Sequence, residues 1–376
     1  MKILILTNYA NGLWLFRKEL LMAFMEDGHE VLVSVPPDEN VDKLRSLQCK
    51  GRTAKIIETP FERRGNNPVR DFGLFLKYTG MLRRDKPDVV LTYTIKPNLY
   101  GGLACRMRRI PYLCNITGLG TAIENGGVLS KILLKFYRMS TRKAQRVFFQ
   151  NTKNRDFMKR HGVAVDNSMM LPGSGVNLKE HPFRKYPSER EGINLLAVIR
   201  IMKDKGIEEY LEAAIIMKHR DSRLRFWLAG EYEQETKEQY EPVIRELEQC
   251  GAVRYLGHLD NVAEVMAQSH IIVHPSYHEG LSNVLLEAAA CGRPVLASSI
   301  NGCIETFREG KSGYSFEKES VDSLLDAIER IAQLPEAQRR HMGEKGRAWV
   351  EKHFDRNIVI EAYRNELAGL RNHEIR

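Results

Sequence analysis

The segment Ile271-Ile-Val-His-Pro-Ser-Tyr-His-Glu-Gly-Leu-Ser-Asn-Val-Leu-Leu-Glu287 contains the local pattern on which the fold assignment depends. It opens with a short apolar run that predicts a buried strand, continues through a turn of small and polar residues, and then predicts a helix that begins near Asn283. A buried strand followed directly by a helix is the repeating unit of a parallel sheet covered by helices. The segment therefore predicts an α/β fold.

The same unit recurs along the chain in two series. The first series of expected strands comprises Lys2–Thr7, Glu30–Val35, Asp88–Tyr93, Pro111–Ile116 and Arg146–Gln150, and the second comprises Ile193–Ile199, Leu224–Ala229, Ile271–His274 and Pro294–Ala297. Residues 178–192, between the series, are charged and poor in apolar side chains, which is typical of a linker. We therefore expect two doubly wound, Rossmann-like α/β domains at residues 1–177 and 178–346, and a helical tail at 347–376 that crosses back to the first domain. Ligands bind beyond the carboxyl ends of parallel strands, so two such domains facing each other would enclose one cleft.

The net charge of +9 is distributed unevenly over the 376 residues. Residues 1–180 hold 30 Lys and Arg against 16 Asp and Glu, whereas residues 181–376 hold 27 against 32. The basic half is suited to an anionic partner, and a nucleic acid, a lipid headgroup surface and a phosphorylated substrate all fit. A content of 43% hydrophobic and 28% charged residues excludes a largely disordered or collagen-like chain.

The cysteines and the apolar runs indicate the compartment. The six cysteines are scattered without a Cys-x-x-Cys pair, which argues against a disulfide framework or a zinc site and favours a reducing cytoplasm. No apolar run reaches the roughly 20 residues that span a bilayer, and the apolar start Met1–Thr7 is too short for a signal-peptide core.

The turn and helix of the opening segment carry the residues best suited to chemistry. A helix start offers unpaired backbone N–H groups that bind phosphate well. In this segment the expected donors are those of Leu281, Ser282, Asn283 and Val284. Glu279 in the turn and Glu287 in the second turn of the helix would flank them, and each carboxylate could hold sugar or ribose hydroxyls. An ordinary helix N-terminus with surface glutamates is the alternative.

A basic turn follows the first expected strand of the second series. Arg200 and Lys205 would project from it toward the place that Glu279 faces. An arginine fork and a mobile lysine charge can together neutralise a diphosphate without a metal ion. A solvated basic turn before a helix is the alternative.

Three loops of the first half follow expected strands. The loop 7–12 contains Gly12 but no G-x-G-x-x-G, which argues against a Rossmann dinucleotide site. The loop 115–121 has the composition of an active-site loop or of a plain turn. The third loop, residues 94–98, places a lysine directly before a helix that begins with proline. The residues singled out in these last two loops are Asn115, Thr117, Gly118, Gly120 and Lys96.

The basic excess is densest between residues 101 and 150, where nine Lys and Arg face a single acid. One helical stretch there spaces its cations three or four residues apart, so they share a face. These cations are Lys131, Lys135, Arg138 and Arg142. The pattern fits a helix lying on an anionic membrane surface, and it also fits a normal surface helix with its apolar side in the core.

With these residues in hand, the chain resembles the GT4 family of retaining glycosyltransferases, which have the two-domain GT-B fold. The resemblance covers essentially the whole chain, and the Glu279 and Glu287 pair matches the family motif E-x7-E. In the first half, Lys96-Pro-Asn-Leu-Tyr-Gly101 and Asn115-Ile-Thr-Gly-Leu-Gly120 resemble the branch that acts on undecaprenyl-diphosphate-linked sugars. Many members have a histidine near the donor sugar where this chain offers Asn115 and Thr117.

The resemblance implies that residues 1–177 bind the acceptor and residues 178–346 bind the nucleotide sugar. It places Lys96, Asn115, Thr117, Gly118 and Gly120 on acceptor or active-site loops, and it implies roles for the other singled-out residues. Arg200 and Lys205 would bind the donor diphosphate, Glu279 would hold the donor sugar, and Glu287 would hold the ribose. The region around His258 would meet the base, the loop at Gly12 would close over the phosphates, and the amides of residues 281–284 would line the site. Retention is ascribed in this family to front-face attack assisted by the departing phosphate, without a dedicated base.

Residues and resemblance together predict a retaining hexosyltransferase. We expect it to move a hexose or N-acetylhexosamine from a UDP-sugar to a lipid-linked or growing glycan, for example in capsule synthesis, with no metal, no further cofactor and no nucleic acid. We expect it to be cytoplasmic and peripheral on the inner face of the plasma membrane. The alternatives are a non-catalytic nucleotide-sugar or polyanion-binding protein, and an epimerase or phosphorylase on a similar scaffold.

Overall fold

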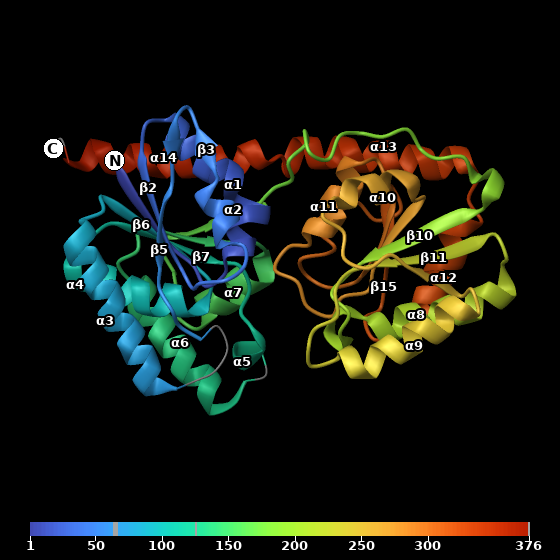
Figure 1. Ribbon diagram of the computed structural model, residues 1–376, viewed down its shortest axis with the longest axis horizontal. Helices are drawn as coiled ribbons and strands as arrows, with labels where there is room; N and C mark the ends of the chain where they lie inside the picture. The colour runs from blue at the N-terminus through green and yellow to red at the C-terminus, as the bar shows by residue number, and fades with distance from the viewer. Residues whose placement is uncertain (63–66, 125, 375–376) are drawn as a thin grey trace. The chain divides into compact units, whose positions relative to one another are not determined.

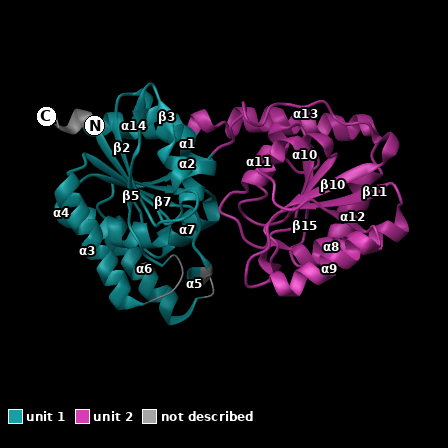
Figure 2. Ribbon diagram, viewed as in Figure 1, with its two compact units in different colours: residues 1–174, 359–376 teal, residues 175–358 magenta. Residues whose placement is uncertain are grey.

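The computed structural model describes residues 1–62, 67–124 and 126–374, and it divides into two compact units (Figure 2). Unit 1 comprises residues 1–174 and 359–376, and unit 2 comprises residues 175–358. Each unit is a parallel sheet with helices on both faces (Figure 1). The predicted class, two doubly wound Rossmann-like α/β domains, is therefore confirmed.

The sheet of unit 1 has the strand order β5-β2-β1-β6-β7-β8-β9. Its strands are β1 (Lys2–Leu6), β2 (Glu30–Val35), β5 (Lys55–Glu58), β6 (Val89–Tyr93), β7 (Tyr112–Ile116), β8 (Arg146–Phe149) and β9 (Ser168–Met170). A separate hairpin consists of β3 (Gln48–Cys49) and β4 (Arg52–Thr53). From β1 the chain moves outward to β2 and β5, and it then restarts at β6 on the other side of β1. The strand order thus reverses between β1 and β6, the topological switch point where such sheets bind ligands.

Two helical layers cover the unit 1 sheet. One core cluster lies under α1 (Ala10–Glu26), α2 (Val41–Arg45) and α14 (Arg356–Glu374). The other lies under α3 (Pro68–Asp85), the π-helical turn η1 (Pro97–Gly101), α4 (Gly102–Arg108), α5 (Thr121–Glu124), α6 (Gly127–Thr141) and α7 (Thr152–Arg160). Strands buried on both faces explain why their sequences are continuous apolar runs rather than alternating ones.

The sheet of unit 2 has the order β12-β11-β10-β13-β14-β15, with its switch point between β10 and β13. Its strands are β10 (Ile193–Val198), β11 (Leu224–Ala229), β12 (Val253–Tyr255), β13 (Ile271–His274), β14 (Val295–Ser298) and β15 (Gly313–Phe316). The covering helices are α8 (Ile207–Arg220), α9 (Lys237–Gln249), α10 (Val262–Gln268), α11 (Asn283–Ala290), α12 (Val321–Ala332) and α13 (Glu336–His353).

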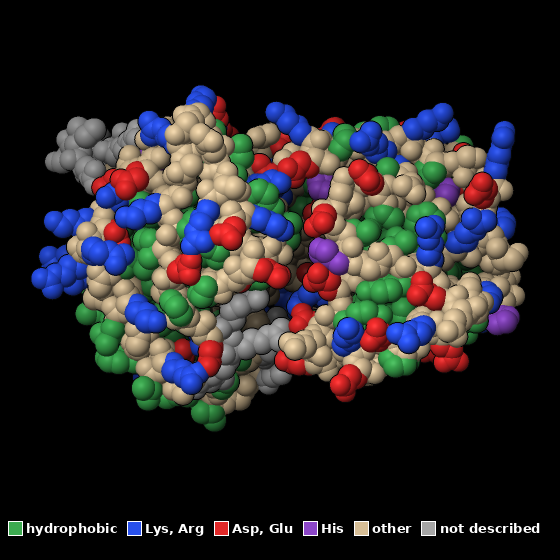
Figure 3. All heavy atoms as spheres, in the orientation of Figure 1, with side chains coloured by type: hydrophobic (Ala, Val, Ile, Leu, Met, Phe, Trp, Pro, Cys, Tyr) green, Lys and Arg blue, Asp and Glu red, His purple; other side chains and the backbone are tan. Residues whose placement is uncertain are grey.

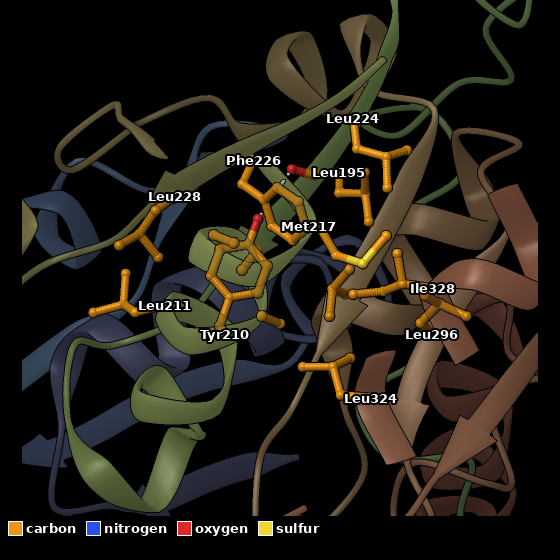
Figure 4. Packing of buried hydrophobic residues seen from close by; sticks show 14 of the residues in the cluster. Leu195, Tyr210, Leu211, Met217, Leu224, Phe226, Leu228, Leu296, Leu324 and Ile328 are labelled. Carbon is orange, nitrogen blue, oxygen red and sulfur yellow. Dashed lines mark hydrogen bonds between the residues drawn. The ribbon is translucent and has the colours of Figure 1, made fainter. Parts of the chain in front are cut away.

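Packing under α8 shows how apolar spacing becomes a core (Figure 4). Tyr210 and Met217 of α8 point into a cluster with Phe226 of β11 and Ile328 of α12. The buried Tyr210 hydroxyl lies 3.0 Å from the carbonyl oxygen of Leu195 and 2.8 Å from that of Trp227, which share its single proton, so this hydroxyl is hydrogen-bonded within the core.

The expected linker at 178–192 lies inside unit 2. The buried Arg293 guanidinium donates to the carbonyl oxygens of Arg184 at 3.1 Å and Lys185 at 3.0 Å. Tyr186 is buried beside it. The backbone of this segment therefore provides hydrogen-bond acceptors for a buried arginine. Its polar composition does not reveal this role.

The C-terminal tail, expected at residues 347–376, also enters unit 1 at a different residue. Helix α13 and the start of α14 belong to unit 2, and the chain enters unit 1 at Val359 within α14. Tyr363 and Leu367 of α14 are buried in the unit 1 core. The segment that packs in unit 1 therefore begins twelve residues later than expected.

Candidate active site

The switch point of the unit 2 sheet brings together the turns that follow β10 and β13. These strands are hydrogen-bonded neighbours and run parallel, so their carboxyl ends lie side by side. Lys205 ends the short helical turn η3 (Lys203–Lys205) after β10, and its Nζ lies 2.6 Å from Oε1 of Glu279 in the turn after β13. Lys205 also donates to Ser276 Oγ at 3.2 Å. Two predicted residues thus form one ion pair where doubly wound sheets bind their ligands.

Glu279 is held ionised by its neighbours. Burial alone would raise its pKa, but the His274 ring, with Nε2 3.0 Å from Oε1, and the Lys205 charge together hold the pKa well below its usual range. Hydrogen bonds and an opposite charge thus outweigh desolvation. His274, the last residue of β13, is buried. Sequence reasoning quoted His274 only as a strand end and missed this contact.

Two glycines shape the Glu279 turn. Gly206 has φ +70°, and a Cβ on it would lie 2.1 Å from the carbonyl oxygen of Pro275. Gly302 has φ +88°, and a Cβ there would lie 2.7 Å from the carbonyl oxygen of Glu279. Backbone approaches this close are open only to glycine. The Glu279 carboxylate therefore sits on a turn clamped between two neighbouring segments.

The start of α11 already uses part of its donor set. Ser282 is the N-cap, and its Oγ accepts from the Leu285 amide at 3.4 Å. The Ser282 amide donates to the carbonyl oxygen of Gly302 at 2.7 Å, so it is not available to a ligand in this arrangement. Leu281 points its side chain into a core cluster, while Asn283 and Val284 form the first helical turn.

Arg200 and His258 lie on exposed turns of unit 2. Arg200 follows β10, but its half-exposed guanidinium is paired with Glu233 and not with Glu279. His258 follows β12, and its Nδ1 lies 3.1 Å from Glu231 Oε1. The structure therefore places Lys205 beside Glu279 and holds Arg200 by a different carboxylate.

Glu287 lies in the second turn of α11, as the spacing predicts, and its side chain is 18% exposed. Its Oε1 is 4.0 Å from His181 Nε2. Burial raises its pKa to about 7, with the charge of Arg356 opposing and that of Glu180 adding to the shift. Glu279 and Glu287 thus have opposite pKa shifts, because a histidine and a lysine surround the first and burial dominates at the second.

In unit 1, the loop after β1 leads into α1. Gly12 lies in the first turn of α1, where a Cβ would be 3.3 Å from the Tyr9 ring. The Ala10 amide donates to Asp38 Oδ2 at 3.0 Å, so a distant carboxylate caps this helix start. Nothing in the loop's own sequence signals Asp38.

Asn115 is a buried link rather than an exposed loop residue. Its Oδ1 accepts from the Tyr363 hydroxyl of α14, and its Nδ2 donates to the carbonyl oxygen of Thr92 at 3.2 Å. Tyr93 donates to the Tyr363 hydroxyl at 3.0 Å. The predicted place of Asn115 on an active-site loop stays a prediction, and the structure adds that its side-chain amide is hydrogen-bonded inside unit 1.

The other loop residues lie nearer the surface. Thr117 and Gly118 are half-buried, and Gly120 is exposed with φ +77°. Lys96 pairs with Asp71 of α3, with Nζ 2.7 Å from Oδ1.

The predicted membrane-facing cations, Lys131, Lys135 and Arg138 of α6 and Arg142 at its C-cap, are all exposed. Arg138 donates to the carbonyl oxygen of His161 at 2.7 Å. In the described part of the chain, no helix has the length and apolar character needed to cross a bilayer. Over those same residues, no cluster of three or more His, Cys, Asp or Glu is arranged to hold a metal ion.

Solved structures identify the class of protein to which this fold belongs. HepE of Anabaena, in complex with UDP, superposes with a TM-score of 0.79 at 16% identity, covering 98% of this chain and 100% of that one. Sucrose-phosphate synthase of Thermosynechococcus elongatus gives 0.80 at 18% identity, covering 98% and 100%. The fold is that of the GT-B glycosyltransferases.

Two family models then divide the chain between them. Residues 11–173 match the glycosyl transferase 4-like domain, and residues 179–349 match glycosyl transferases group 1. The chain therefore belongs to the glycosyltransferase family that combines these two domains.

Curated relatives match over most of their length. The N,N'-diacetylbacillosaminyl-diphospho-undecaprenol α-1,3-N-acetylgalactosaminyltransferase of Campylobacter jejuni is 27% identical over 96% of this chain and 97% of its own. The capsular polysaccharide biosynthesis glycosyltransferase CapM of Staphylococcus aureus is 24% identical over 78% of this chain and 81% of its own. The chain is a glycosyltransferase of glycan biosynthesis, as predicted.

Proposed function

We propose that the chain is a retaining glycosyltransferase that moves a hexose or N-acetylhexosamine from a UDP-sugar to a lipid-linked or growing glycan. The observation that carries this proposal is the Lys205–Glu279 pair at the β10–β13 switch point. A UDP donor is supported by HepE, a fold relative solved with UDP and with UDP-glucose. A lipid-diphosphate acceptor is supported by the C. jejuni relative, whose name states one.

In this proposal the donor diphosphate binds two cations that already form ion pairs with carboxylates in the structure. Lys205 is held by Glu279 and Arg200 by Glu233, so an arriving diphosphate competes with these carboxylates. Both cations follow β10, and both could reach a phosphate near the start of α11. Positive charge at the departing phosphate stabilises UDP as a leaving group without a metal ion.

Glu279 acts in this proposal as a fixed negative charge. Because its pKa lies well below the usual range, it stays ionised at neutral pH and is not a proton donor. An ionised carboxylate can accept hydrogen bonds from the donor sugar. It can also stabilise the positive charge that develops at the anomeric carbon of that sugar. The departing phosphate then takes the proton of the acceptor hydroxyl as that hydroxyl attacks from the same face.

The remaining residues bind the donor in this proposal. Glu287 accepts from the ribose hydroxyls, His258 lies toward the base, and the amides of Leu281, Asn283 and Val284 line the phosphate site.

The test is a product screen. UDP-sugars are combined with undecaprenyl-diphosphate-linked mono- and disaccharides, and products are identified by mass spectrometry, with anomeric configuration assigned by NMR. Wild-type protein is expected to give one product that keeps the donor's anomeric configuration, and Glu279→Ala and Arg200→Ala are expected to give none while remaining folded. An inverted product would overturn the retaining mechanism, and near-normal turnover in both variants would overturn the site.

We further propose that unit 1 lies on an anionic membrane from the cytoplasmic side. Exposed apolar side chains recur one turn apart on α3, at Val69, Phe72 and Leu76. Further exposed apolar side chains lie on α6, at Val128, Leu129, Ile132 and Met139. The cations of α6 lie among them, and Figure 3 shows apolar and basic side chains mixed over α3 and α6. Exposed apolar residues next to cations are the combination that binds an anionic lipid surface.

A further inference from the structure

The two side chains that hold Glu279 contact the same carboxylate oxygen. Lys205 Nζ lies 2.6 Å from Oε1, and His274 Nε2 lies 3.0 Å from the same atom. The second oxygen, Oε2, accepts no hydrogen bond from any residue that the structure describes. The Glu279 side chain is 16% exposed. The arrangement therefore holds one oxygen twice and leaves the other for a ligand.

The two partners are anchored differently. His274 ends β13, a central strand of the unit 2 sheet, and its side chain is 4% exposed. Lys205 approaches from the short turn η3, and its side chain is 17% exposed. A histidine ring on two torsions is fixed by the strand that carries it, whereas the flexible aliphatic stem of a lysine can redirect its charge. Lys205 is therefore the partner that can leave, and His274 is the partner that stays.

Donor binding separates the two partners in the proposed function. A diphosphate carries more negative charge than one carboxylate, so it draws Lys205 away from Glu279. A carboxylate largely withdrawn from water takes up a proton if it loses all its partners. Burial raises the pKa of Glu279, and the hydrogen bond from His274 is the largest of the effects that lower it. His274 is thus placed to keep the carboxylate ionised after Lys205 has turned to the phosphates.

Packing does not explain why this strand ends in histidine. The second ring nitrogen, Nδ1, is buried and has no hydrogen-bond partner among the described residues. Ala297, which is paired in register with His274 on β14, belongs to an apolar core cluster. A buried nitrogen without a partner costs free energy, and an apolar side chain would avoid that cost. The contact with Glu279 is what histidine supplies here.

We propose that His274 is the positioning residue that holds Glu279 while Lys205 exchanges this carboxylate for the donor diphosphate. Through Nε2 it keeps Oε1 in place, so that Oε2 meets the donor sugar with the charge intact. The inference rests on the proposed function, because it describes how the same site changes partners. A carboxylate with two partners releases one more readily than a carboxylate with one, so His274 also eases the release of Lys205.

Variants at the two ends of β13 test this role. His274→Leu removes the hydrogen bond and keeps an apolar side chain at the strand end. His274→Gln keeps an N–H donor the same number of bonds from Cα as Nε2. His270→Leu is the matched control, because His270 is also buried and directly precedes β13, while its Nδ1 accepts from the Asn194 amide at 2.9 Å. Thermal unfolding checks that each variant is folded.

Isothermal titration calorimetry with UDP measures the exchange. We expect His274→Leu to lower UDP affinity about five- to tenfold, because Lys205 is then the sole partner of Glu279. His274→Gln and His270→Leu should stay within about twofold of wild type. In the Glu279→Gln background no carboxylate competes for Lys205, so adding His274→Leu should change UDP affinity less than about twofold. An equal loss in both backgrounds, or a His274→Gln variant as weak as His274→Leu, would overturn the proposal.

Turnover separates failure of this role from failure of the proposed function. The probes are UDP-N-acetylgalactosamine and undecaprenyl-diphosphate-linked N,N'-diacetylbacillosamine. We expect His274→Leu to lower kcat about tenfold or more and His274→Gln to restore it to within about threefold of wild type. An unchanged kcat in His274→Leu would reject the role of His274 and leave the transferase intact.

Two further outcomes concern the wild-type protein. Absence of turnover with every donor would reject the transferase, while the UDP titrations would still decide on His274. Absence of UDP binding would overturn both proposals, because Lys205 would then have no diphosphate to exchange for Glu279.

Discussion

Lys205 Nζ and Glu279 Oε1 lie 2.6 Å apart although 74 residues separate them in the chain. The contact exists because β10 and β13 are neighbours at the point where the strand order of unit 2 reverses. It joins a largely buried cation to a carboxylate whose pKa is held well below its usual range, at the switch point where we propose that the donor diphosphate binds. The predictions below test how this pair is held and what it serves.

Gly302 is expected to be required for the position of Glu279. In Gly302→Ala the new Cβ would lie 2.7 Å from the Glu279 carbonyl oxygen, so the turn must move and kcat should fall by about tenfold or more. The control is Gly251→Ala, which has the same left-handed backbone at φ +71° but no atom within 4 Å of the new Cβ. Thermal unfolding and turnover are measured for both. Equal kcat in the two variants would contradict a positioning role for Gly302.

Glu287 should make stability depend on pH in the absence of ligand. Its pKa is raised from 4.5 to about 7, so the folded protein binds more protons than the unfolded chain between these values, and stability falls as pH rises through that window. Glu287→Gln removes this cost, and we expect it to be more stable than wild type by on the order of 1–3 kcal/mol at pH 8, with no gain near pH 4. Urea unfolding at both pH values measures the difference, with the exposed Glu212→Gln as control. A gain that is equal at both pH values would show that the buried charge is not its cause.

Tyr363 should stabilise unit 1 from the far end of the chain. Tyr363→Phe deletes the hydroxyl that joins Asn115 and Tyr93 and leaves a buried amide oxygen without that donor. We expect a loss of about 1–3 kcal/mol in the free energy of unfolding. Arg364 lies on the same helix as Tyr363 and forms a surface ion pair with Asp27. Arg364→Ala breaks this pair and should cost no more than about 1 kcal/mol. A Tyr363→Phe variant as stable as wild type would show that the network adds nothing.

Membrane binding should depend on the basic side of α6. We expect the double variant Lys131→Glu, Lys135→Glu to reduce flotation with anionic vesicles by about tenfold or more, because each basic residue near such a surface contributes about 1 kcal/mol. Lys237→Glu, Lys345→Glu makes the same change in charge on exposed residues of unit 2 and serves as control. Equal loss in both variants would attribute binding to net charge alone, and no loss in either would reject the surface.

Central strands were predictable from the sequence because they are buried on both faces and therefore continuously apolar. Edge strands such as β9 and β12 have only three residues each, and neither was predicted, because a single exposed edge leaves a weak apolar signal. The proximity of Lys205 and Glu279 was also predictable, since each follows a strand at the same edge of one sheet.

Other parts of the site depend on tertiary contacts that no local pattern carries. Tyr363 donates a hydrogen bond to Asn115, 248 residues away in the chain. Arg200 forms an ion pair with Glu233, which is one of several acids in a polar loop. The role of His274 depends on its being the last residue of β13, so that its ring reaches the carboxylate five residues later. Predicting such contacts requires the strand order and the exact residue at which each strand ends.

The most direct test of the central claim is the turnover of Glu279→Gln, which keeps the shape of the side chain and removes its charge. We predict that kcat for sugar transfer falls by about 100- to 1,000-fold, the size of effect seen when one preorganised electrostatic contact to a transition state is lost. Calorimetric affinity for UDP should not fall, since the lost charge serves the sugar and its removal leaves Lys205 free for the diphosphate. A Glu279→Gln enzyme that turns over at the wild-type rate would contradict the claim that this carboxylate serves the reaction.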